Sequence, residues 1–268
     1  MATCMLPMFA GMIPGGLRYG SSYVVEFEPD SPWFEMSLTM AAEALIDGLK
    51  TEYHVFIHPP SEVRESLSKL GLDVERLERE DSLRILDTYD VMTGLAAPET
   101  PAGMRSKGRE PIETHHSFNL EGWSGRVLNA IKQGVTQDEK RWLHLDDNTS
   151  ILNHYSEERT IIDTWRERFV PYARVRELVL VNSLVSGVAS ENFYKHFEAL
   201  CDGIIDLQSR EEAGRFEHYA RVRTLRGGSV DSRWRKLRLL SNGGVKTDSG
   251  SVKERGLGLG GWLKGPRK

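Results

Sequence analysis

Short apolar segments alternate with longer segments of helical periodicity along most of this 268-residue chain. The first pair is the apolar, β-branched run 23–27, followed by the tight loop 28–32 and the mostly apolar run 33–49. A strand, a helix and a further strand in succession are typical of parallel sheets, because parallel neighbours need a crossover connection. The chain is therefore predicted to be an α/β protein with a mostly parallel sheet and helices on both faces.

The alternation continues downstream. Further strands are predicted over residues 53–57, 83–89, 141–147, 178–182 and 201–207. Helices are predicted over residues 61–70, 73–79, 123–133, 156–170 and 192–200, with Pro171 ending the fourth of them. The last third is predicted to be antiparallel, with a hairpin of strands 204–209 and 215–223 and a further strand over 234–240.

Net charge, cysteine spacing and the distribution of apolar residues limit the classes of protein to which this chain can belong. A formal net charge of -4 is small for this length and does not indicate a general nucleic-acid-binding chain. Cys4 and Cys201 are far apart and fit no metal or redox spacing. No secretory leader and no run of about 18 apolar residues is visible, so we expect a cytoplasmic protein outside the membrane.

Segment composition also suggests the domain organisation. Residues 13–245 are expected to form one domain, preceded by an N-terminal lead-in over residues 1–12. Within it, residues 94–121 are rich in Pro, Gly and charged residues and are predicted to be a long mobile loop. Residues 246–268 are Gly-, Lys- and Ser-rich and are predicted to be a disordered tail.

Three motifs carry a resemblance to a known family. They are Gly-Gly-Leu-x-x-Gly-x-x-Tyr-Val-Val at 15–25, the helix, Leu-Gly and Asp pattern at 61–77, and Leu-Cys-Asp-Gly-Ile-Ile-Asp-Leu at 200–207. Together they resemble the KaiC-like branch of the RecA-type P-loop ATPases. The resemblance implies a RecA-like three-layer α/β/α domain whose mostly parallel sheet carries a C-terminal antiparallel extension.

The phosphate-binding loop that the resemblance implies is degenerate. In the family this loop supplies glycines, a lysine and a magnesium-binding hydroxyl. Residues 28–39 contain neither glycine nor lysine, and the lysine position falls on about Ser37 and the hydroxyl on Leu38 or Thr39. Two prolines remove N–H donors, and carboxylates in and beside the loop repel phosphate. We expect Ser31 to cap the following helix, with Pro32 in its first turn.

Other functional positions of the family have changed too. The catalytic glutamate position is degenerate, since residues 57–60 read Ile-His-Pro-Pro, and His58 is expected to be an exposed loop residue. Asp146 matches the aspartate that orients the water shell of Mg²⁺ and would do so if Mg-ATP bound; otherwise Asp146 and Asp147 are expected to cap the turn 150–154. Thr224 replaces a lysine, whereas Arg226 matches an arginine that reaches a γ-phosphate across a ring of subunits.

This pattern favours a catalytically inactive KaiC-like protein that acts as a regulatory or scaffolding module. No cofactor and no metal are then expected, catalytic residues are not expected, and Ser37, Thr39, Asp146 and Arg226 form a vestigial nucleotide site. A protein partner is expected, and a homo-oligomer is left open. The alternative is a divergent ATPase of signalling or DNA-recombination type, using ATP and Mg²⁺ with Asp146, Thr39 and Arg226.

Nucleic-acid binding is a further hypothesis, resting on basic residues clustered in the C-terminal hairpins. On alternating strand positions they could form a basic face, although charges also protect a solvated sheet edge. They are Arg221, Arg223, Arg226, Arg233, Arg235, Lys236 and Arg238.

Overall fold

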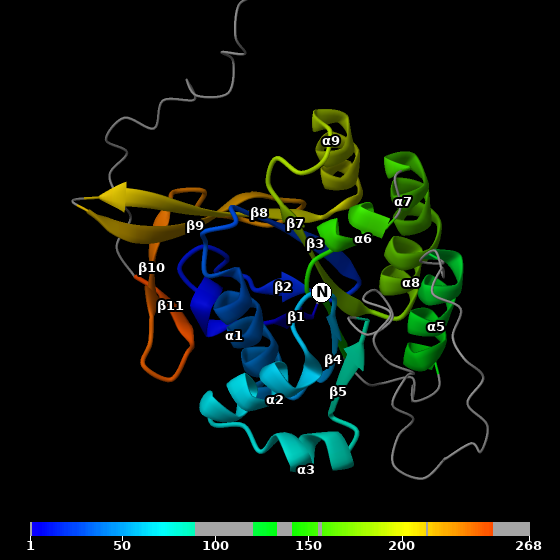
Figure 1. Ribbon diagram of the computed structural model, residues 1–268, viewed down its shortest axis with the longest axis horizontal. Coiled ribbons are helices and arrows are strands. Elements are labelled where there is room, and N and C mark those ends of the chain that lie inside the picture. The colour runs from blue at the N-terminus through cyan, green and yellow to red at the C-terminus, as the bar shows by residue number, and fades with distance from the viewer. Residues whose placement is uncertain (1, 89–119, 133–140, 155–156, 213, 249–268) are drawn as a thin grey trace, which may run out of the picture.

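A nine-stranded sheet forms the centre of the protein (Figure 1). The computed structural model describes residues 2–88, 120–132, 141–154, 157–212 and 214–248. The order across the sheet is β11-β10-β9-β8-β3-β7-β6-β4-β5. These strands are β3 (Ser21–Phe27), β4 (Lys50–Val55), β5 (Leu83–Asp87), β6 (Arg141–Leu145), β7 (Leu178–Val185), β8 (Gly203–Glu212), β9 (Arg215–Leu225), β10 (Arg235–Leu239) and β11 (Val245–Thr247).

Six neighbouring strands run parallel to one another: β8, β3, β7, β6, β4 and β5. Beyond β8, the strands β9, β10 and β11 continue the sheet with antiparallel pairing. The predicted fold class, a mostly parallel sheet with a C-terminal antiparallel extension, is thus confirmed. The Asp-Gly motif has a steric reason: a Cβ on Gly203 would lie 2.6 Å from the Tyr23 ring. Only glycine allows β8 to pass so close to β3.

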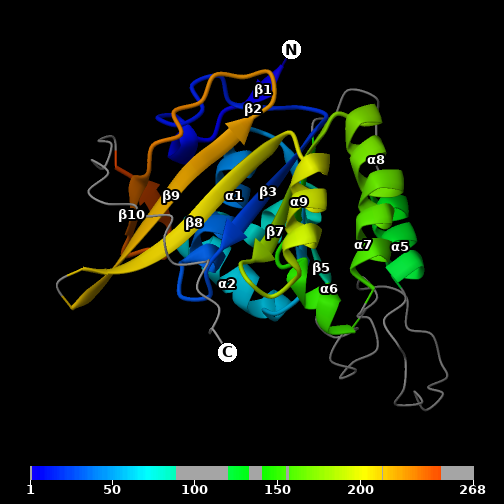
Figure 2. The same cartoon turned by 90° about the horizontal axis from the view of Figure 1, so that it is seen from above.

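Helices cover both faces of the sheet (Figures 1 and 2). One face carries α1 (Trp33–Ile46), α2 (Pro60–Lys69) and α3 (Val74–Arg79). The opposite face carries α5 (Leu120–Lys132), α7 (Glu158–Thr164), η2 (Trp165–Phe169), α8 (Val170–Val175) and α9 (Glu191–Leu200), and the short α6 (Thr149–His154) follows β6. Separate buried apolar clusters fill the two sides of the sheet, so the domain has three layers.

Several predicted element boundaries were wrong. Pro171 does not end its helix, because the π-helical turn η2 precedes it and α8 continues to Val175. The wider turn bonds the Val170 amide to the Trp165 carbonyl five residues back, and it absorbs the break that a proline makes in the α-helical ladder. The strand predicted over 53–57 lies earlier, over Lys50–Val55. Its pairing with β6 begins at Lys50.

The N-terminal segment is packed into the domain. β1 (Thr3–Cys4) pairs with β2 (Leu17–Arg18), and the 3-10 turn η1 (Pro7–Phe9) lies between them in the chain. Met8, Phe9 and Met12 are buried in the same cluster as α1 and β3. At the other end, β11 extends the sheet two residues beyond 245. Residues 94–119 of the predicted loop and 249–268 of the predicted tail lie outside the described residues.

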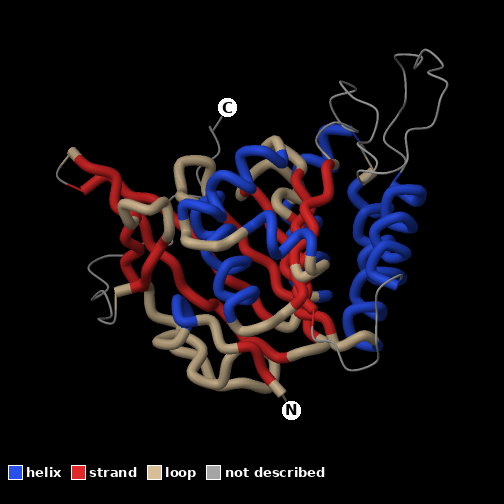
Figure 3. The backbone as a smooth tube through the Cα atoms, turned by 90° about the horizontal axis from the view of Figure 1, so that it is seen from below, coloured by secondary structure: helices blue, strands red, loops and turns tan. Residues whose placement is uncertain are grey.

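The hairpin of β8 and β9 reaches beyond the remaining strands at one edge of the molecule (Figure 3). Its pairing runs from Gly203 with Leu225 to Glu212 with Arg215, so both strands are longer than predicted. Within the described ranges, no helix has the length and apolar character needed to cross a membrane.

Candidate functional site

A hollow of about 320 Å³ lies beside the loop that joins β3 to α1. We call it the loop pocket. Its lining includes Pro29 and Trp33 from the loop and the first turn of α1, His58 beyond β4, and Asp146 directly after β6. These segments follow the carboxyl ends of parallel strands, which is the edge where α/β sheets bind their ligands.

The loop is held by β8. The Ser209 amide donates to the Glu28 carboxylate at 2.9 Å, and the Ser209 hydroxyl donates to the Asp30 carbonyl at 3.0 Å. Pro32 is the N-cap of α1, and the Ser31 hydroxyl donates to the Glu28 carbonyl instead of capping the helix. The prediction that Ser31 caps α1 is therefore wrong, because a proline occupies the cap and the serine closes the loop on itself.

Trp33 fills the space beneath the loop. Its ring stacks between Phe27 and His144, with centroid distances of 5.3 and 5.6 Å. Its indole N–H donates to the Asp146 carbonyl at 2.7 Å. The first residue of α1 is thus an anchored aromatic side chain that ties the loop to the end of β6.

Asp146 is 1% exposed and is bound on one side only. The Tyr53 hydroxyl donates to its Oδ1 at 3.1 Å, and the Ser37 hydroxyl lies 2.6 Å from that of Tyr53. Its Oδ2 has no hydrogen-bond partner among the described residues. Burial, with a smaller contribution from Asp147, raises the pKa of Asp146 to about 7, although His58 opposes the rise.

His144 completes the aromatic stack in its neutral form. Its ring lies 4.7 Å from that of Tyr53 with an interplanar angle of 4°. Burial lowers the pKa of His144 to about 3, and neither ring nitrogen has a hydrogen-bond partner among the described residues. The ring therefore acts as an uncharged packing surface.

Asp147 and Asp146 have different roles. The Asp147 carboxylate accepts from the Thr149 amide at 2.8 Å and from the Ser150 hydroxyl at 2.9 Å. The prediction of a cap is confirmed for Asp147. It is wrong for Asp146, whose carboxylate faces Tyr53 because consecutive residues at the end of β6 point to different sides.

The structure brings two of the four predicted site residues together. Ser37 and Asp146 are linked through the Tyr53 hydroxyl. The Thr39 hydroxyl instead donates to the Glu35 carbonyl and accepts from the Val245 amide at 2.9 Å, so it joins α1 to β11. Thr39 therefore faces away from the Tyr53 and Asp146 pair.

Arg226 lies near the amino-terminal ends of the parallel strands, whereas Asp146 lies at their carboxyl ends. It follows Leu225, which pairs with Gly203 at the start of β8, whereas Asp146 follows the end of β6. Its amide donates to the Asp202 carbonyl, and its guanidinium lies 3.4 Å from the Asp202 carboxylate. Within one chain Arg226 therefore cannot act on a group bound near Asp146.

His58 is more enclosed than the sequence suggested. Its side chain is 32% exposed, its ring stacks on Phe34 at a centroid distance of 3.8 Å, and its Nδ1 lies 3.2 Å from the Glu62 carboxylate. It lines the loop pocket. The expectation of an exposed loop histidine holds for its place between β4 and α2, but its exposure is only partial because Phe34 covers one side of the ring.

Sequence reasoning missed the aromatic residues of the site. Trp33, Tyr53 and His144 lie on α1, β4 and β6 and meet only because those elements are neighbours in space. The sequence placed Tyr53 and His144 in predicted strands, but their paired positions on adjacent strands are visible only in the structure. Among the described residues, no group of three or more His, Cys, Asp or Glu side chains is placed to hold a metal ion.

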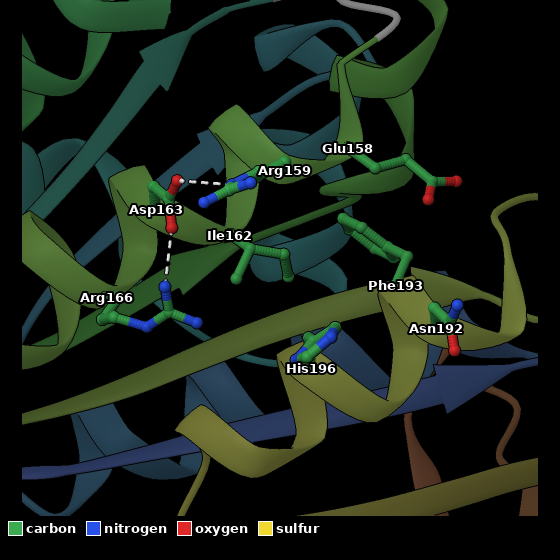
Figure 4. Close-up of a pocket in the computed structure, with 8 residues that line it drawn as sticks. All are labelled: Glu158, Arg159, Ile162, Asp163, Arg166, Asn192, Phe193 and His196. Carbon is green, nitrogen blue, oxygen red and sulfur yellow. Dashed lines mark hydrogen bonds and ion pairs between the residues drawn. The ribbon is translucent and has the colours of Figure 1, made fainter.

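A second hollow, of about 360 Å³, lies between α7 and α9 (Figure 4). Ile162 and Phe193 line it, and charged side chains surround them. Asp163 forms ion pairs with Arg159 and Arg166, and Glu158 accepts from the Ser190 amide. These charges already have partners within the protein.

The basic residues of the C-terminal strands are also paired. Each of the seven has a carboxylate within 4.0 Å, and Arg223 has three. The pairs are Arg221 with Asp206, Arg223 with Asp206, Glu26 and Glu198, Arg226 with Asp202, Arg233 and Arg235 with Asp231, Lys236 with Glu217, and Arg238 with Asp248.

Comparison with known proteins identifies the fold. The crystal structure of a KaiC-like protein from the hyperthermophilic archaeon Pyrococcus horikoshii matches with a TM-score of 0.68 over 92% of this chain and 98% of that chain. The chain has a KaiC-like RecA-type fold. Sequence identity in this match is 15%, so the likeness concerns the fold alone. No protein-family model matches the chain, and neither does the sequence of any curated protein.

The loop pocket lies beside residues 28–39, the segment for which the sequence resemblance implies a phosphate-binding loop.

Proposed function

We propose that this protein is a catalytically inactive member of the KaiC-like fold that serves as a regulatory or scaffolding module for protein contacts. The proposal rests mainly on the buried position of Trp33. Where a phosphate-binding loop needs backbone space for the anion, an indole lies buried beneath the loop and is bonded to the Asp146 carbonyl. Bound phosphate and this indole compete for the same region.

The charge around the loop supports the same proposal. Glu35, Asp146 and Asp147 line the loop pocket, and no described lining residue is Lys or Arg. Triphosphate carries several negative charges and would meet carboxylates without a compensating cation. The loop after Pro29 also offers one backbone N–H donor fewer to a phosphate, because Pro32 has no N–H.

The position of Asp146 favours the second candidate, a divergent ATPase. Asp146 directly follows β6 beside the β3 loop, where the resemblance implies an aspartate that orients the water shell of Mg²⁺, and its Oδ2 has no hydrogen-bond partner among the described residues. In this candidate Arg226 would act on a nucleotide bound by a second copy of the chain. Within its own chain it lies near the amino-terminal ends of the parallel strands, away from Asp146.

Calorimetric titration of the full chain with ATP and Mg²⁺ tests the proposal. We expect no saturable binding up to millimolar nucleotide. Binding in the micromolar range would overturn the proposal of an inactive module.

A phosphate-release assay separates the two candidates. The inactive module releases no phosphate above a protein-free control. Phosphate release that Asp146→Ala abolishes and Asp163→Ala leaves intact would establish the ATPase, since Asp163 lies outside the loop pocket.

A further inference from the structure

The carboxylates and guanidiniums between β3, β8, β9 and α9 do not balance. Arg223 on β9 contacts Glu26 on β3 at 2.8 Å and Glu198 on α9 at 2.5 Å. It shares Asp206 on β8 with Arg221, which contacts that carboxylate at 2.6 Å. We call these five residues the α9 cluster. Three carboxylates meet two guanidiniums, so one negative charge has no cation of its own within the cluster.

The backbone holds these groups in place. Glu26 and Asp206 are paired residues on the parallel strands β3 and β8, so their side chains lie on the same face of the sheet. Arg223 lies at a β-bulge, because the residues on either side of it pair with Ile204 and Ile205, which are consecutive in β8. A bulge turns a side chain out of the regular ladder. The helix α9 covers this part of the sheet (Figure 2), and its last turn brings a carboxylate to Arg223.

One oxygen of Glu26 lacks a donor. Its Oε2 accepts from Arg223 at 2.8 Å, whereas its Oε1 is buried and has no hydrogen-bond partner among the described residues. The Glu198 carboxylate lies within hydrogen-bond reach of Glu26. Two ionised carboxylates are acceptors only, so they cannot bond to each other. A single proton on the pair removes the surplus charge and supplies the missing donor.

The surroundings of Glu26 favour a protonated pair. Burial and the neighbouring Glu198 raise the pKa of Glu26 to about 7, although Arg223 opposes the rise. Cys201, which follows α9, lies near both carboxylates, but burial raises the pKa of its thiol to about 12 and keeps it uncharged. On the β7 side, the residue paired with Glu26 is the apolar Leu184. The charge between β3 and α9 therefore changes with the proton on this pair.

We propose that Glu26 and Glu198 share one proton at neutral pH, and that loss of this proton loosens α9 from the sheet. Without the proton, two ionised carboxylates compete for the same guanidinium. Opening of α9 relieves the repulsion, because both carboxylates then regain water. Since α9 also forms one wall of the hollow beside α7, the proton acts on that surface as well. This inference goes beyond the proposed function, because it depends on no nucleotide and no partner.

The direction of the pH effect follows from the raised pKa. When α9 opens, Glu26 becomes hydrated and loses its proton at its ordinary pKa of 4.5. Between this pH and about 7, the closed state therefore holds a proton that the open state has released. The stability of the closed state falls as pH rises through this range, and it levels off above it.

Hydrogen exchange of the full chain, measured by mass spectrometry, tests the inference. Exchange rates of the α9 amides, corrected for the intrinsic pH dependence of amide exchange, report how often the helix opens. We expect the equilibrium constant for opening to rise about tenfold or more from pH 5 to pH 8, since one pKa unit corresponds to a factor of ten. Little further change is expected above pH 8.

Variants locate the proton. Glu26→Gln and Glu198→Gln each leave two carboxylates for two guanidiniums, so opening of α9 is expected to vary by about twofold or less over the same pH range. Glu191→Gln is the matched control, because it lies on the same helix in an exposed pair with Lys195 and should keep the tenfold change. Asp146→Asn should keep it too, since that carboxyl group lies outside the α9 cluster.

A ¹³C titration of the side-chain carboxyl groups gives a direct second readout. The signals of the pair are assigned by their loss in the two glutamine variants. The pair is expected to titrate with one apparent midpoint of about 7. If Glu26→Gln does not fold, Glu198→Gln and the wild-type titration still decide the matter.

Three results would overturn the inference. They are midpoints near 4.5 for both carboxyl groups, opening of α9 that does not change with pH in the wild type, and an unchanged pH dependence in the glutamine variants. A purely structural role of Glu26 predicts the last of these, because its loss would then raise opening by the same factor at every pH.

Discussion

Two charged regions of the molecule differ in how completely their charges are paired. On the β8–β9–β10 side, seven basic residues each have a carboxylate partner, and Arg223 alone contacts Glu26, Glu198 and Asp206. At the loop pocket, Asp146 is more deeply buried and one of its oxygens has no partner within the described residues. Paired cations keep their charge in the folded protein, whereas burial without a partner disfavours the ionised form of a carboxyl group, as the raised pKa of Asp146 illustrates.

The largest effect is expected at the loop pocket. Trp33→Ala removes a buried indole from the stack between Phe27 and His144, and it should lower the free energy of unfolding by about 3 kcal/mol or more. Urea denaturation measures the change. Trp33→Phe keeps a ring in place and should cost less, and equal losses in the two variants would contradict the role of the indole.

In the region of paired charges, the largest loss of stability is expected when Arg223 is removed, because it contacts three carboxylates. Arg223→Ala leaves three carboxylates without their shared partner and should cost about 2 kcal/mol, a value reduced for partial exposure. Arg238→Ala is the matched control, because that side chain is 66% exposed and Asp248 is its one carboxylate partner among the described residues. Its cost should stay within about 0.5 kcal/mol in the same urea assay.

The pH dependence of stability tests whether Asp146 is buried without a charged partner. The folded-state pKa of Asp146 is raised from 3.8 to about 7, so the folded protein retains a proton that the unfolded chain releases. This residue's contribution to stability therefore falls as pH rises from about 4 to about 7. Asp146→Asn should gain stability relative to the wild type between pH 5 and pH 8, by on the order of 1 kcal/mol or more. A pH-independent difference between the two proteins in urea denaturation would contradict it.

The smallest effect is expected for nucleic acid. Since the basic residues of the C-terminal strands are paired with carboxylates, little positive charge is left to contact phosphates. A gel shift with single- and double-stranded DNA should detect no complex at 150 mM salt. Tight binding that weakens steeply between two salt concentrations would instead favour a nucleic-acid-binding protein.

Local sequence determined most of the fold. Alternating apolar runs and glycine stops predicted the strands from β3 to β10 and most of the helices between them, whereas the reason for glycine at position 203, the close approach of Tyr23, is visible only in the structure. What failed depended on tertiary context. Pro171 stays within a helical segment because a π-helical turn precedes it, and no local pattern predicts such a turn.

The site was less predictable than the fold. Asp146 could be singled out because it ends an apolar strand, but its Tyr53 partner comes from a strand nearly a hundred residues earlier. Thr39 has a hydroxyl at a suggestive spacing, yet it faces β11, since a helix side is fixed by packing and not by distance along the chain. The charge pairing of Arg223 likewise depends on four separate elements.

The N-terminal segment is hydrogen-bonded to the C-terminal part of the described chain. The Thr247 hydroxyl on β11 donates to the Met8 carbonyl, and the Asp231 amide donates to the Met12 carbonyl. A ribosome makes Thr247 some 240 residues after Met8. At a usual pace of about 5–20 residues per second, Met8 must wait more than ten seconds for this neighbour. Until then the hydrogen bonds from Asp231 and Thr247 to this segment cannot form, so its early packing relies on α1 and β3, which share its buried cluster.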